Sequence, residues 1–540
     1  MTQNLFATLT LTTFCLTACG TEAPANTDDS TTSGSSSSSS GGEECWIGER
    51  DCRCTDGGGC DRGLVCEAGT CVDDEMSTTT GTSTSTTGST TDMTTTGSST
   101  GDPLACDANL GLINPDCPEE LPYCKAGLCG DCASIFSCAE VDQDNPICDI
   151  PSGECVECTE DNDSACEGAT PICDTMANIC VGCSDHGECP NSSCDIETGA
   201  CMDPEKVLYI FTDTGKSNNC TDMKGLGGTF KNPYCVFNIA LEHAMNNGGL
   251  DGWTFKMLPG APYAQPKVVL ESESPFTVAI IADQNASDAA DFSSVYPSVD
   301  TTGDITLYLH NLDFESGATI SDNPTLLCRQ GARLHISHSQ IRGGAGPGLR
   351  GEDCNITLND SVVTMNKSEG IEMSGGSLVM SNTFVTNNGH PGSKYGGGGL
   401  SLSGVGVDMV YTTIVDNMSP DGVDSIHCND VVGGIENSII THNPASPNQS
   451  VDCPGLIINH SLVDEAGETG DENQQWDSQV ILSLLEGGNG IYRILNEEAQ
   501  AMIQGIALWT VWDPSTDFEG DPRPKENGAA DTPGADVLPL

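Results

Sequence analysis

Basic residues are scarce in this chain of 540 residues. Lys and Arg number 19 against 79 Asp and Glu, which gives a formal net charge of −60. Nucleic-acid binding needs clustered Lys and Arg to neutralise phosphates, and anionic lipid headgroups repel a surface of this charge. We therefore expect no nucleic-acid partner, and we expect any membrane association to depend on an anchor.

Long apolar runs are lacking as well, and the stretch from Leu5 to Leu16 is too short to span a bilayer. It has the length of a signal-peptide core and ends in Leu16-Thr17-Ala18-Cys19, which resembles a bacterial lipobox. This resemblance implies that residues 1–18 are a signal peptide and that Cys19 becomes a lipidated N-terminus at the outer membrane or cell surface. An ordinary cleaved signal with an incidental cysteine is the alternative.

Thirty cysteines exclude a reducing compartment, so the chain is expected to be exported. Six lie within residues 45–72, sixteen within 105–203 and six beyond 204. The Ser/Thr-rich segments 19–44 and 73–104 are predicted linkers. Because each group of cysteines is even in number, closed disulfide pairing within each part is the simplest prediction.

The second cysteine block is repetitive, each unit containing a Cys-x-x-Cys pair. The predicted units are Cys124/Cys129/Cys132/Cys138, Cys148/Cys155/Cys158/Cys166 and Cys173/Cys180/Cys183/Cys189, closed by Cys194 and Cys201. The spacing of Cys180, Cys183, His186 and Cys189 also suits zinc, but an oxidising compartment favours disulfides. We therefore expect no metal and no cofactor, with Ca²⁺ at the Asp- and Asn-rich loops as the weaker alternative to simple turns.

The second half carries a recurring strand motif, in which Ser or Thr precedes two apolar residues and then Asn or Asp. Copies begin at Ser361, Thr383, Thr413, Ser438 and Ser461, with looser copies at Asn311 and Ser339, so the spacing is 22 to 30 residues. Such a period indicates stacked coils that bury their apolar residues against one another. We expect the Ser/Thr and Asn columns to form hydrogen-bonded ladders. One apolar column should line the core, and the other, facing outward, is a candidate binding surface.

The ends of residues 205–540 carry a family resemblance. A strand at 207–211, the segment 232–244 with helical spacing, a following strand and the DFEGDPRP and PGADV segments resemble pectin-lyase-like right-handed parallel β-helix proteins of bacterial surfaces. The resemblance implies an all-β solenoid with an N-terminal capping helix and a bridge between Cys220 and Cys235. The family contains lyases and hydrolases as well as binding proteins, so the fold alone does not define the activity.

Evidence for catalysis is weak in the sequence. Residues 205–540 contain neither the paired aspartates and GHG of polygalacturonases nor an Arg-x-Pro-x-x-Arg of the pectate-lyase kind. We name no catalytic residue. Candidate ligand contacts are Lys394 and Tyr395, in an insertion between coils, and Asp416 with His442, which neighbouring coils could bring together.

The leading hypothesis is a monomeric surface lipoprotein that binds polysaccharide or another cell-surface ligand without turnover. A polysaccharide lyase or hydrolase is the alternative, and a structural spacer is the third possibility. The acidic charge argues against polyanionic glycans unless calcium bridges them.

If Cys19 carries the lipid, Cys19→Ala should move the protein from the membrane fraction to the soluble fraction. Immunoblotting of fractionated cells measures this, with Cys15→Ala as the control that should stay in the membrane. Equal membrane retention of the Cys19→Ala protein would contradict the anchor.

Overall fold

The computed structural model describes residues 64–67, 70–73, 117, 123–125, 128–132, 138–211, 220–221, 223–258, 263–264, 268–282, 290–294, 297–316, 322–390, 398–420, 422–464, 470 and 472–538. The chain divides into two compact units, Met1–Gly88 and Ser89–Leu540. In the first unit, β1 (Leu64–Glu67) and β2 (Thr70–Asp73) form an antiparallel hairpin. No helix in the described ranges is long and apolar enough to cross a membrane. Cys19, the predicted lipidation site, lies outside the described residues.

Disulfides organise residues 132–201 into three modules of four cysteines. Within each module the first cysteine bonds the third and the second bonds the fourth. The pairs are Cys132–Cys148 and Cys138–Cys155, Cys158–Cys173 and Cys166–Cys180, and Cys183–Cys194 and Cys189–Cys201. The predicted units were therefore offset, because each Cys-x-x-Cys spans the boundary between two modules instead of lying inside one.

A short hairpin carries the last two cysteines of each module. The hairpins are β5 (Ile147–Asp149) with β6 (Glu154–Val156), β7 (Ile172–Asp174) with β8 (Ile179–Val181), and β9 (Cys194–Asp195) with β10 (Ala200–Cys201). β3 (Tyr123–Lys125) and β4 (Leu128–Gly130) repeat the arrangement upstream, where Cys129 bonds Cys117. Two short helices position the second cysteine of a module. α2 (Cys138–Val141) begins with Cys138 of the first module, and η1 (His186–Glu188) is followed directly by Cys189 of the third.

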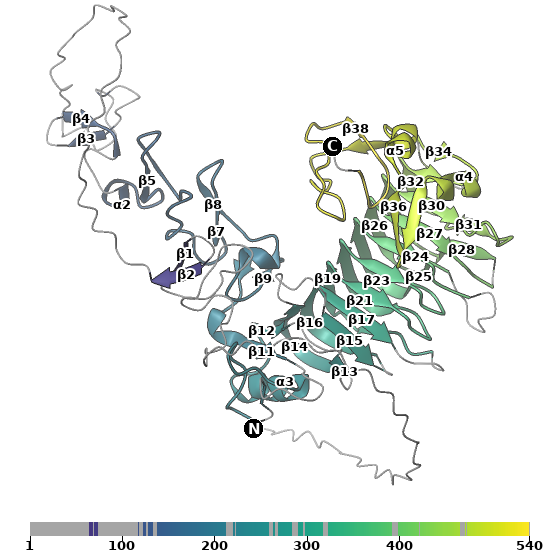
Figure 1. Cartoon of the computed structure of the whole chain (residues 1–540), viewed down its shortest axis with the longest axis horizontal. Helices are drawn as coiled ribbons and strands as arrows, with labels where there is room; N and C mark the ends of the chain where they lie inside the picture. The colour runs from purple at the N-terminus through teal and green to yellow at the C-terminus, as the bar shows by residue number, and fades with distance from the viewer. Residues whose placement is uncertain are drawn as a thin grey trace, which may run out of the picture. The chain divides into compact units, whose positions relative to one another are not determined.

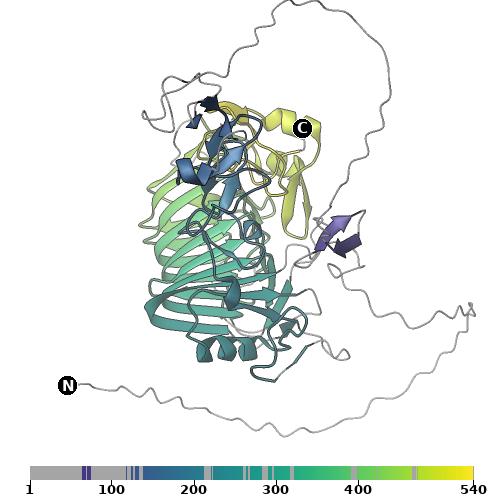
Figure 2. The same ribbon diagram turned by 90° about the vertical axis from the view of Figure 1, so that its left-hand side faces the viewer.

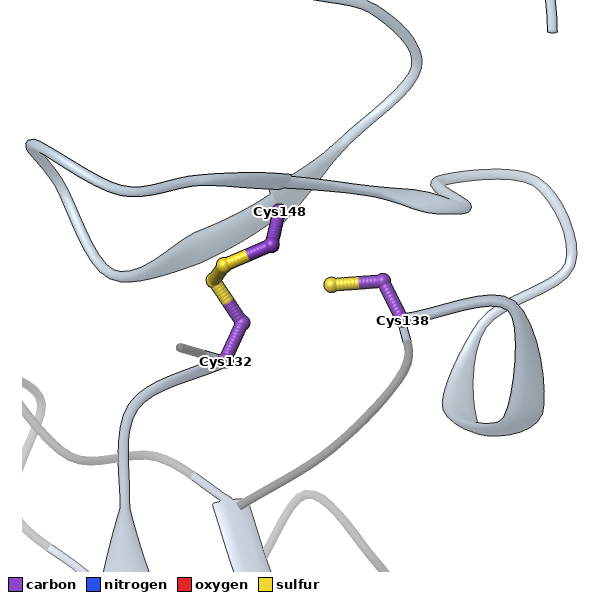
Figure 3. A group of neighbouring side chains, drawn as sticks. All are labelled: Cys132, Cys138 and Cys148. Atoms are coloured by element: carbon purple, nitrogen blue, oxygen red, sulfur yellow. A yellow bond between two sulfur atoms is a disulfide. The ribbon is translucent and has the colours of Figure 1, made fainter. Parts of the chain in front are cut away.

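Figure 3 shows the close approach of three sulfur atoms in the first module. The Cys132 and Cys148 sulfurs are joined, and the Cys138 sulfur beside them is bonded to Cys155. Cys180, Cys183 and Cys189 are likewise all in disulfides. The preference for disulfides over a zinc finger is confirmed at these positions.

The described strands between Val207 and Gln475 form a parallel β-helix, as the sequence predicts (Figure 1). Its first sheet, with fourteen strands in the described residues, contains β11 (Val207–Ile210), β12 (Trp253–Met257), β14 (Val268–Ala282), β16 (Val299–His310), β18 (Leu326–Arg329), β19 (Arg333–Ser337), β21 (Leu349–Asn359), β23 (Ile371–Ser381), β25 (Leu400–Ser403), β26 (Gly406–Val410), β28 (Val423–Asn429), β29 (Val432–Glu436), β31 (Gln449–Asp452) and β32 (Leu456–Asn459). Its second, of ten strands, contains β13 (Tyr263–Ala264), β15 (Ala290–Ser294), β17 (Leu312–Ser316), β20 (Gln340–Arg342), β22 (Val362–Thr364), β24 (Phe384–Thr386), β27 (Thr413–Asn417), β30 (Ile439–His442), β33 (Leu462–Val463) and β34 (Gln474–Gln475).

Seven described coils pass from the first sheet to the second through one residue in the left-handed conformation. These corner residues are Asn311, His338, Asp360, Asn382, Tyr411, Asn437 and His460, with φ between 45° and 56°. A single left-handed residue turns the chain sharply, and Asn and Asp tolerate this conformation better than most residues. The corner therefore sets where each coil bends.

A buried Ser or Thr follows most corners and forms the expected ladder. The Ser438 hydroxyl donates to the Glu436 carbonyl at 2.7 Å and accepts from the Thr412 amide of the preceding coil at 3.0 Å. Ser461 repeats the pattern toward Ser438. In the copy that was predicted to begin at Thr413, the ladder residue is Thr412, one position earlier.

The expected asparagine ladder is also present, inside the helix. Asn366, Asn388 and Asn417 are at most 1% exposed. The Asn366 amide nitrogen donates to the Asn388 amide oxygen at 3.0 Å, and the Asn388 nitrogen donates to the Asn417 oxygen at 3.1 Å. Each also donates to a backbone carbonyl of the preceding coil, as Asn388 does to Val363 at 2.9 Å. The ladder thus satisfies polar backbone groups that the turn would otherwise leave buried and unpaired.

The two apolar columns lie on opposite faces of the second sheet. Val363, Val385 and Ile440 belong to the interior core, whereas Val362, Phe384 and Ile439 point outward. The outward residues are at most 3% exposed, because the C-terminal segment, residues 476–538, packs over them. The proposal of an exposed apolar stripe as the binding surface was therefore wrong.

The C-terminal segment contains α4 (Ser478–Ser483), β35 (Leu485–Gly488), β36 (Ile491–Ile494), α5 (Glu497–Ile503), β37 (Ala507–Trp509) and β38 (Ala529–Asp531), drawn in yellow in Figure 1. Arg523, fully buried in its ion pair, lies 3.7 Å over the ring of the corner residue Tyr411 and donates to the Asn382 side chain at 3.3 Å. The Ala535 amide donates to Thr413 at 2.9 Å. The DFEGDPRP and PGADV segments therefore fasten this segment to the β-helix.

At the other end, α3 (Phe237–Asn246) packs its buried Phe237, Ala240 and Ala244 into the core next to β11, and lies beside the first strands in Figure 2. The predicted capping helix is confirmed. The predicted Cys220–Cys235 bridge is also present, together with Cys328–Cys354 and Cys428–Cys453.

Asn388→Ala should lower the free energy of unfolding by about 1–3 kcal/mol, because it leaves buried polar partners unsatisfied. Denaturation followed by circular dichroism measures the change. Asn429→Ala, at an exposed end of β28, is the matched control and should be close to neutral. Equal effects of the two variants would contradict the role of the ladder.

Burial, reinforced by the neighbouring Glu519, raises the pKa of Asp536 from 3.8 to about 8. Between these values the folded protein holds a proton that the unfolded chain releases, so this group makes stability fall as pH rises from about 4 to 8. Asp536→Asn should flatten the decline of the melting temperature across this window. Asp430→Asn, at an exposed site, should keep the wild-type profile, and an unchanged profile for Asp536→Asn would refute the assignment.

Candidate functional site

A cleft of about 470 Å³ lies where the loop 510–516 of the C-terminal segment meets the outer face of the first sheet. Strands β21, β23 and β26 and the corners that follow supply its floor. The lining residues are Asn359, Asp360, Val379, Met380, Ser381, Asn382, Asp408, Val410, Trp512, Asp513, Pro514, Ser515 and Thr516. Polar side chains thus make up most of the floor, and an indole stands at its edge.

The pairing register explains why these side chains are aligned. Thr357, Val379 and Asp408 occupy equivalent positions on successive coils, as do Asn359, Ser381 and Val410. Alternation along a strand turns both columns outward. The Ser381 hydroxyl donates to Asn359 at 2.8 Å, and Ser377 donates to Asn355 at 2.9 Å. The floor is therefore a regular array with the inter-strand spacing of about 4.8 Å.

Corner residues hold the loop over this floor. Asn382 donates to the Thr516 carbonyl at 2.8 Å, while Asn437 exchanges hydrogen bonds with the backbone of Leu508 at 3.1 Å. Inside the loop, Asp513 accepts from the Thr510 amide at 2.6 Å. The loop is fixed at several points, yet the Trp512 residue is 92% exposed.

Exposure of this degree is unusual for a tryptophan on a well-fastened loop, because so large a ring gains stability by packing, and exposed tryptophans are enriched at binding surfaces. Trp509, three residues earlier, is buried and donates its indole N–H to the Pro514 carbonyl at 2.9 Å. The sequence WTVWD therefore contains one tryptophan that anchors the loop and one that is presented to solvent.

The cleft is acidic. Burial raises the pKa of Asp360, with His338 and Asn382 opposing the shift, and burial also raises the pKa of Asp513 against its hydrogen bonds with Thr510. Asp408 is exposed on the floor. The arrangement offers hydrogen-bond acceptors for hydroxyl groups and a ring for stacking, and it disfavours anionic ligands.

A second hollow, of about 530 Å³, is lined by Asn496, Glu497, Glu498 and Leu538. It adjoins the last described residue and offers two carboxylates at the start of the seven-residue α5. It has no aligned polar floor, so the cleft beside Trp512 is the better candidate.

Of the predicted ligand contacts, Asp416 and His442 lie on the paired strands β27 and β30, where Asn417 is the register partner of His442. Lys394 and Tyr395 lie outside the described residues, so their role stays a prediction. Asp416 accepts from the Tyr492 hydroxyl at 2.5 Å and from the Asn443 amide, whereas His442 lies 2.6 Å from Asp464. Burial and this bond to Asp416 raise the pKa of Tyr492. Asp416 and His442 each contact the C-terminal segment, and their role in ligand binding stays a prediction.

His442 also lies 3.4 Å from the Ser478 hydroxyl, so Ser478, His442 and Asp464 have the composition of a hydrolase triad. Ser478 is only 7% exposed, however, and the His442 Nδ1 atom has no hydrogen bond of acceptable geometry. These residues join α4 to β30 and present no accessible nucleophile.

The third disulfide module, residues 183–201, is docked on the first coils. Tyr308 donates to Asp195 at 2.7 Å, Lys256 donates to the Pro190 carbonyl at 2.7 Å, and the buried Ser193 and Thr254 hydroxyls are 2.8 Å apart. Burial and the bond to Asp195 raise the pKa of Tyr308. The module covers the first positions of the outward column that continues through Thr357 into the cleft.

Sequence reasoning missed both this contact and Trp512. A pair of tryptophans before Asp-Pro-Ser was the available signal for a loop with an exposed ring. The docking contacts have no comparable signal, because they join residues about 60 to 110 positions apart.

Comparison with known proteins gives similarities to parts of the chain. The model of a family described as "Family of unknown function (DUF8331)" matches residues 94–207, which include the disulfide modules. The crystal structure of pectate lyase Pel9A is similar over 50% of this chain and 74% of its own, with 16% sequence identity and a TM-score of 0.31. A comparison with curated proteins finds no match. The assignment of the fold rests on the strand pairing itself.

Proposed function

We propose that this protein is an exported, surface-anchored lipoprotein that binds an extended, uncharged polysaccharide in the cleft beside Trp512. The observation that carries the proposal is the 92% exposed Trp512 fixed at the edge of an aligned polar floor. Ten disulfides among the described residues agree with export. Lipidation of Cys19 belongs to this proposal and rests on the lipobox resemblance.

Sugar rings have an apolar C–H face and a rim of hydroxyl groups. An exposed indole offers an apolar surface for the face, and carboxylates and amides accept hydrogen bonds from the rim. The polar columns Asn355–Ser377 and Asn359–Ser381 run across the coils, so they suit an elongated ligand better than a compact one. A polysaccharide chain has this shape.

Charge narrows the ligand class. Asp360, Asp408 and Asp513 line the cleft, and Arg523, the nearby cation, is buried in its contacts with Tyr411 and Asp531. An anionic glycan would meet repulsion in the cleft and from a chain of net charge −60. Neutral glycans are therefore favoured, and a uronate polymer would need bridging calcium.

Hydrolysis is the second candidate function, favoured by two cleft carboxyl groups, Asp360 and Asp513, whose pKa values burial raises. Both carboxyl groups already accept hydrogen bonds that hold the cleft together. Asp360 accepts from Asn382 at 3.1 Å, and Asp513 accepts from the Thr510 amide at 2.6 Å. Binding without turnover is therefore the better supported function.

Trp512→Ala should weaken binding to the preferred neutral glycan at least about tenfold, because loss of an aromatic contact that acts as a binding hot spot costs about 2 kcal/mol or more. Immobilised neutral glycans and polygalacturonate, the latter with and without calcium, would be titrated with the full chain. Phe230→Ala, which removes a 48% exposed ring that does not line the cleft, is the control, and its affinity for the glycan should equal that of the wild type.

Wild-type affinity of the Trp512→Ala protein would contradict the proposed cleft. Release of oligosaccharides with new reducing or unsaturated ends during the same titration would show that the protein is an enzyme. If Asp360→Asn abolished this release, the catalytic site would be the cleft.

A further inference from the structure

We infer that Asp185, His310 and His338 form a binding site for one divalent cation of the zinc type at the junction between the third disulfide module and the β-helix. Their potential ligand atoms all lie within 4.8 Å of one another. Asp185 comes from the module, and the two histidines come from neighbouring coils. This site is separate from the cysteines of the three modules, whose sulfur atoms are in disulfides.

The protein framework positions each ligand. Asp185 is the N-cap of η1, where it accepts from the Gly187 amide at 2.7 Å while Glu188 accepts from the Asp185 amide at 3.0 Å. His310 ends β16 and precedes the corner Asn311, whereas His338 is itself the corner residue of the next coil. The corner geometry therefore places the two rings together, with centroids 5.1 Å apart.

The surroundings of His310 resemble those of a metal ligand. The residue is 3% exposed, and its Nδ1 atom lies 2.8 Å from the Ser337 hydroxyl. Such a contact from the second ring nitrogen orients a ligating imidazole and leaves Nε2 for the metal. His186 packs edge-on against the same ring, at 5.1 Å between centroids, and its Nδ1 accepts from the Cys194 amide at 3.2 Å. The His310 ring is thus held on two sides.

The donor set selects the class of cation. Two imidazoles and one carboxylate suit Zn²⁺ and other first-row divalent ions, whereas Ca²⁺ and Mg²⁺ prefer oxygen ligands. Tetrahedral zinc with bonds of about 2.1 Å would bring the ligand atoms to about 3.4 Å from one another. The half-exposed His338 side chain has room for that adjustment.

Asp360 extends the site toward the cleft. It is the corner residue after His338, and its carboxylate lies 4.0 Å from the His338 Nε2 atom. Asp360 also lines the cleft. A cation here would crosslink the disulfide module to the β-helix and would lie beside the proposed glycan site, although its binding does not depend on that function.

The test uses the full chain with its disulfides formed, any free thiol alkylated with iodoacetamide, and calcium in excess to occupy purely carboxylate sites. Titration with Zn²⁺ by calorimetry, and with Co²⁺ by its visible absorption, should give one site per chain. His338→Ala and Asp185→Asn should each weaken Zn²⁺ binding at least about tenfold.

His427→Ala is the matched control, because His427 pairs with a single carboxylate, Asp452, at 3.7 Å and is similarly exposed. It should bind zinc as the wild type does. Hydrogen exchange adds a second readout: zinc should slow exchange in residues 183–201 of the wild type but not of His338→Ala. Absence of a site in the wild type would overturn the inference. The inference would also be overturned if His338→Ala bound zinc as tightly as the wild type does, or if zinc still slowed hydrogen exchange in residues 183–201 of that variant.

Discussion

The left-handed corner residue is the constraint on which the rest of this structure depends. A coil that turned more gradually would lose the register between strands. Because the corner uses one residue, the next residue always lies at the same depth, and a buried hydroxyl there can bond both its own corner and the neighbouring coil. The interior asparagines likewise bond from one coil to the next, at the other end of the strands of the second sheet. Side chains that emerge at the corners, such as Asn382 and Asn437, are equally well placed to hold other segments.

The parts of the fold that repeat were predictable from sequence. The Ser/Thr and Asn columns, the stacked strands, the capping helix and the Cys220–Cys235 bridge follow from local pattern and from family resemblance. The predicted cysteine units between Cys132 and Cys201 were offset from the observed modules, because no residue pattern marks where a unit begins. The disulfide pairing defines the modules. Periodicity alone could not have supplied that pairing.

The functional surface was much less predictable, for a physical reason. The sequence reveals that one apolar column faces outward, but it does not say what covers it. Residues 476–538 return along the β-helix and bury Phe384 and Ile439, which removes the surface that the pattern favoured. The same return brings Trp512 to strands more than 100 residues away. Contacts of this kind depend on tertiary packing and leave little trace in local sequence.

One outward column of the first sheet now connects these observations. It runs through Tyr308, His335, Thr357, Val379 and Asp408 on successive coils. The third disulfide module covers its beginning, through Tyr308 and through Glu197, which lies 3.3 Å from His335. The loop that carries Trp512 borders its later part. Between these two coverings lies Thr357, which is partly exposed. The disulfide module therefore removes the first positions of the column from solvent, and the side chains that stay accessible, Thr357, Val379 and Asp408, decide which chemistry the column offers.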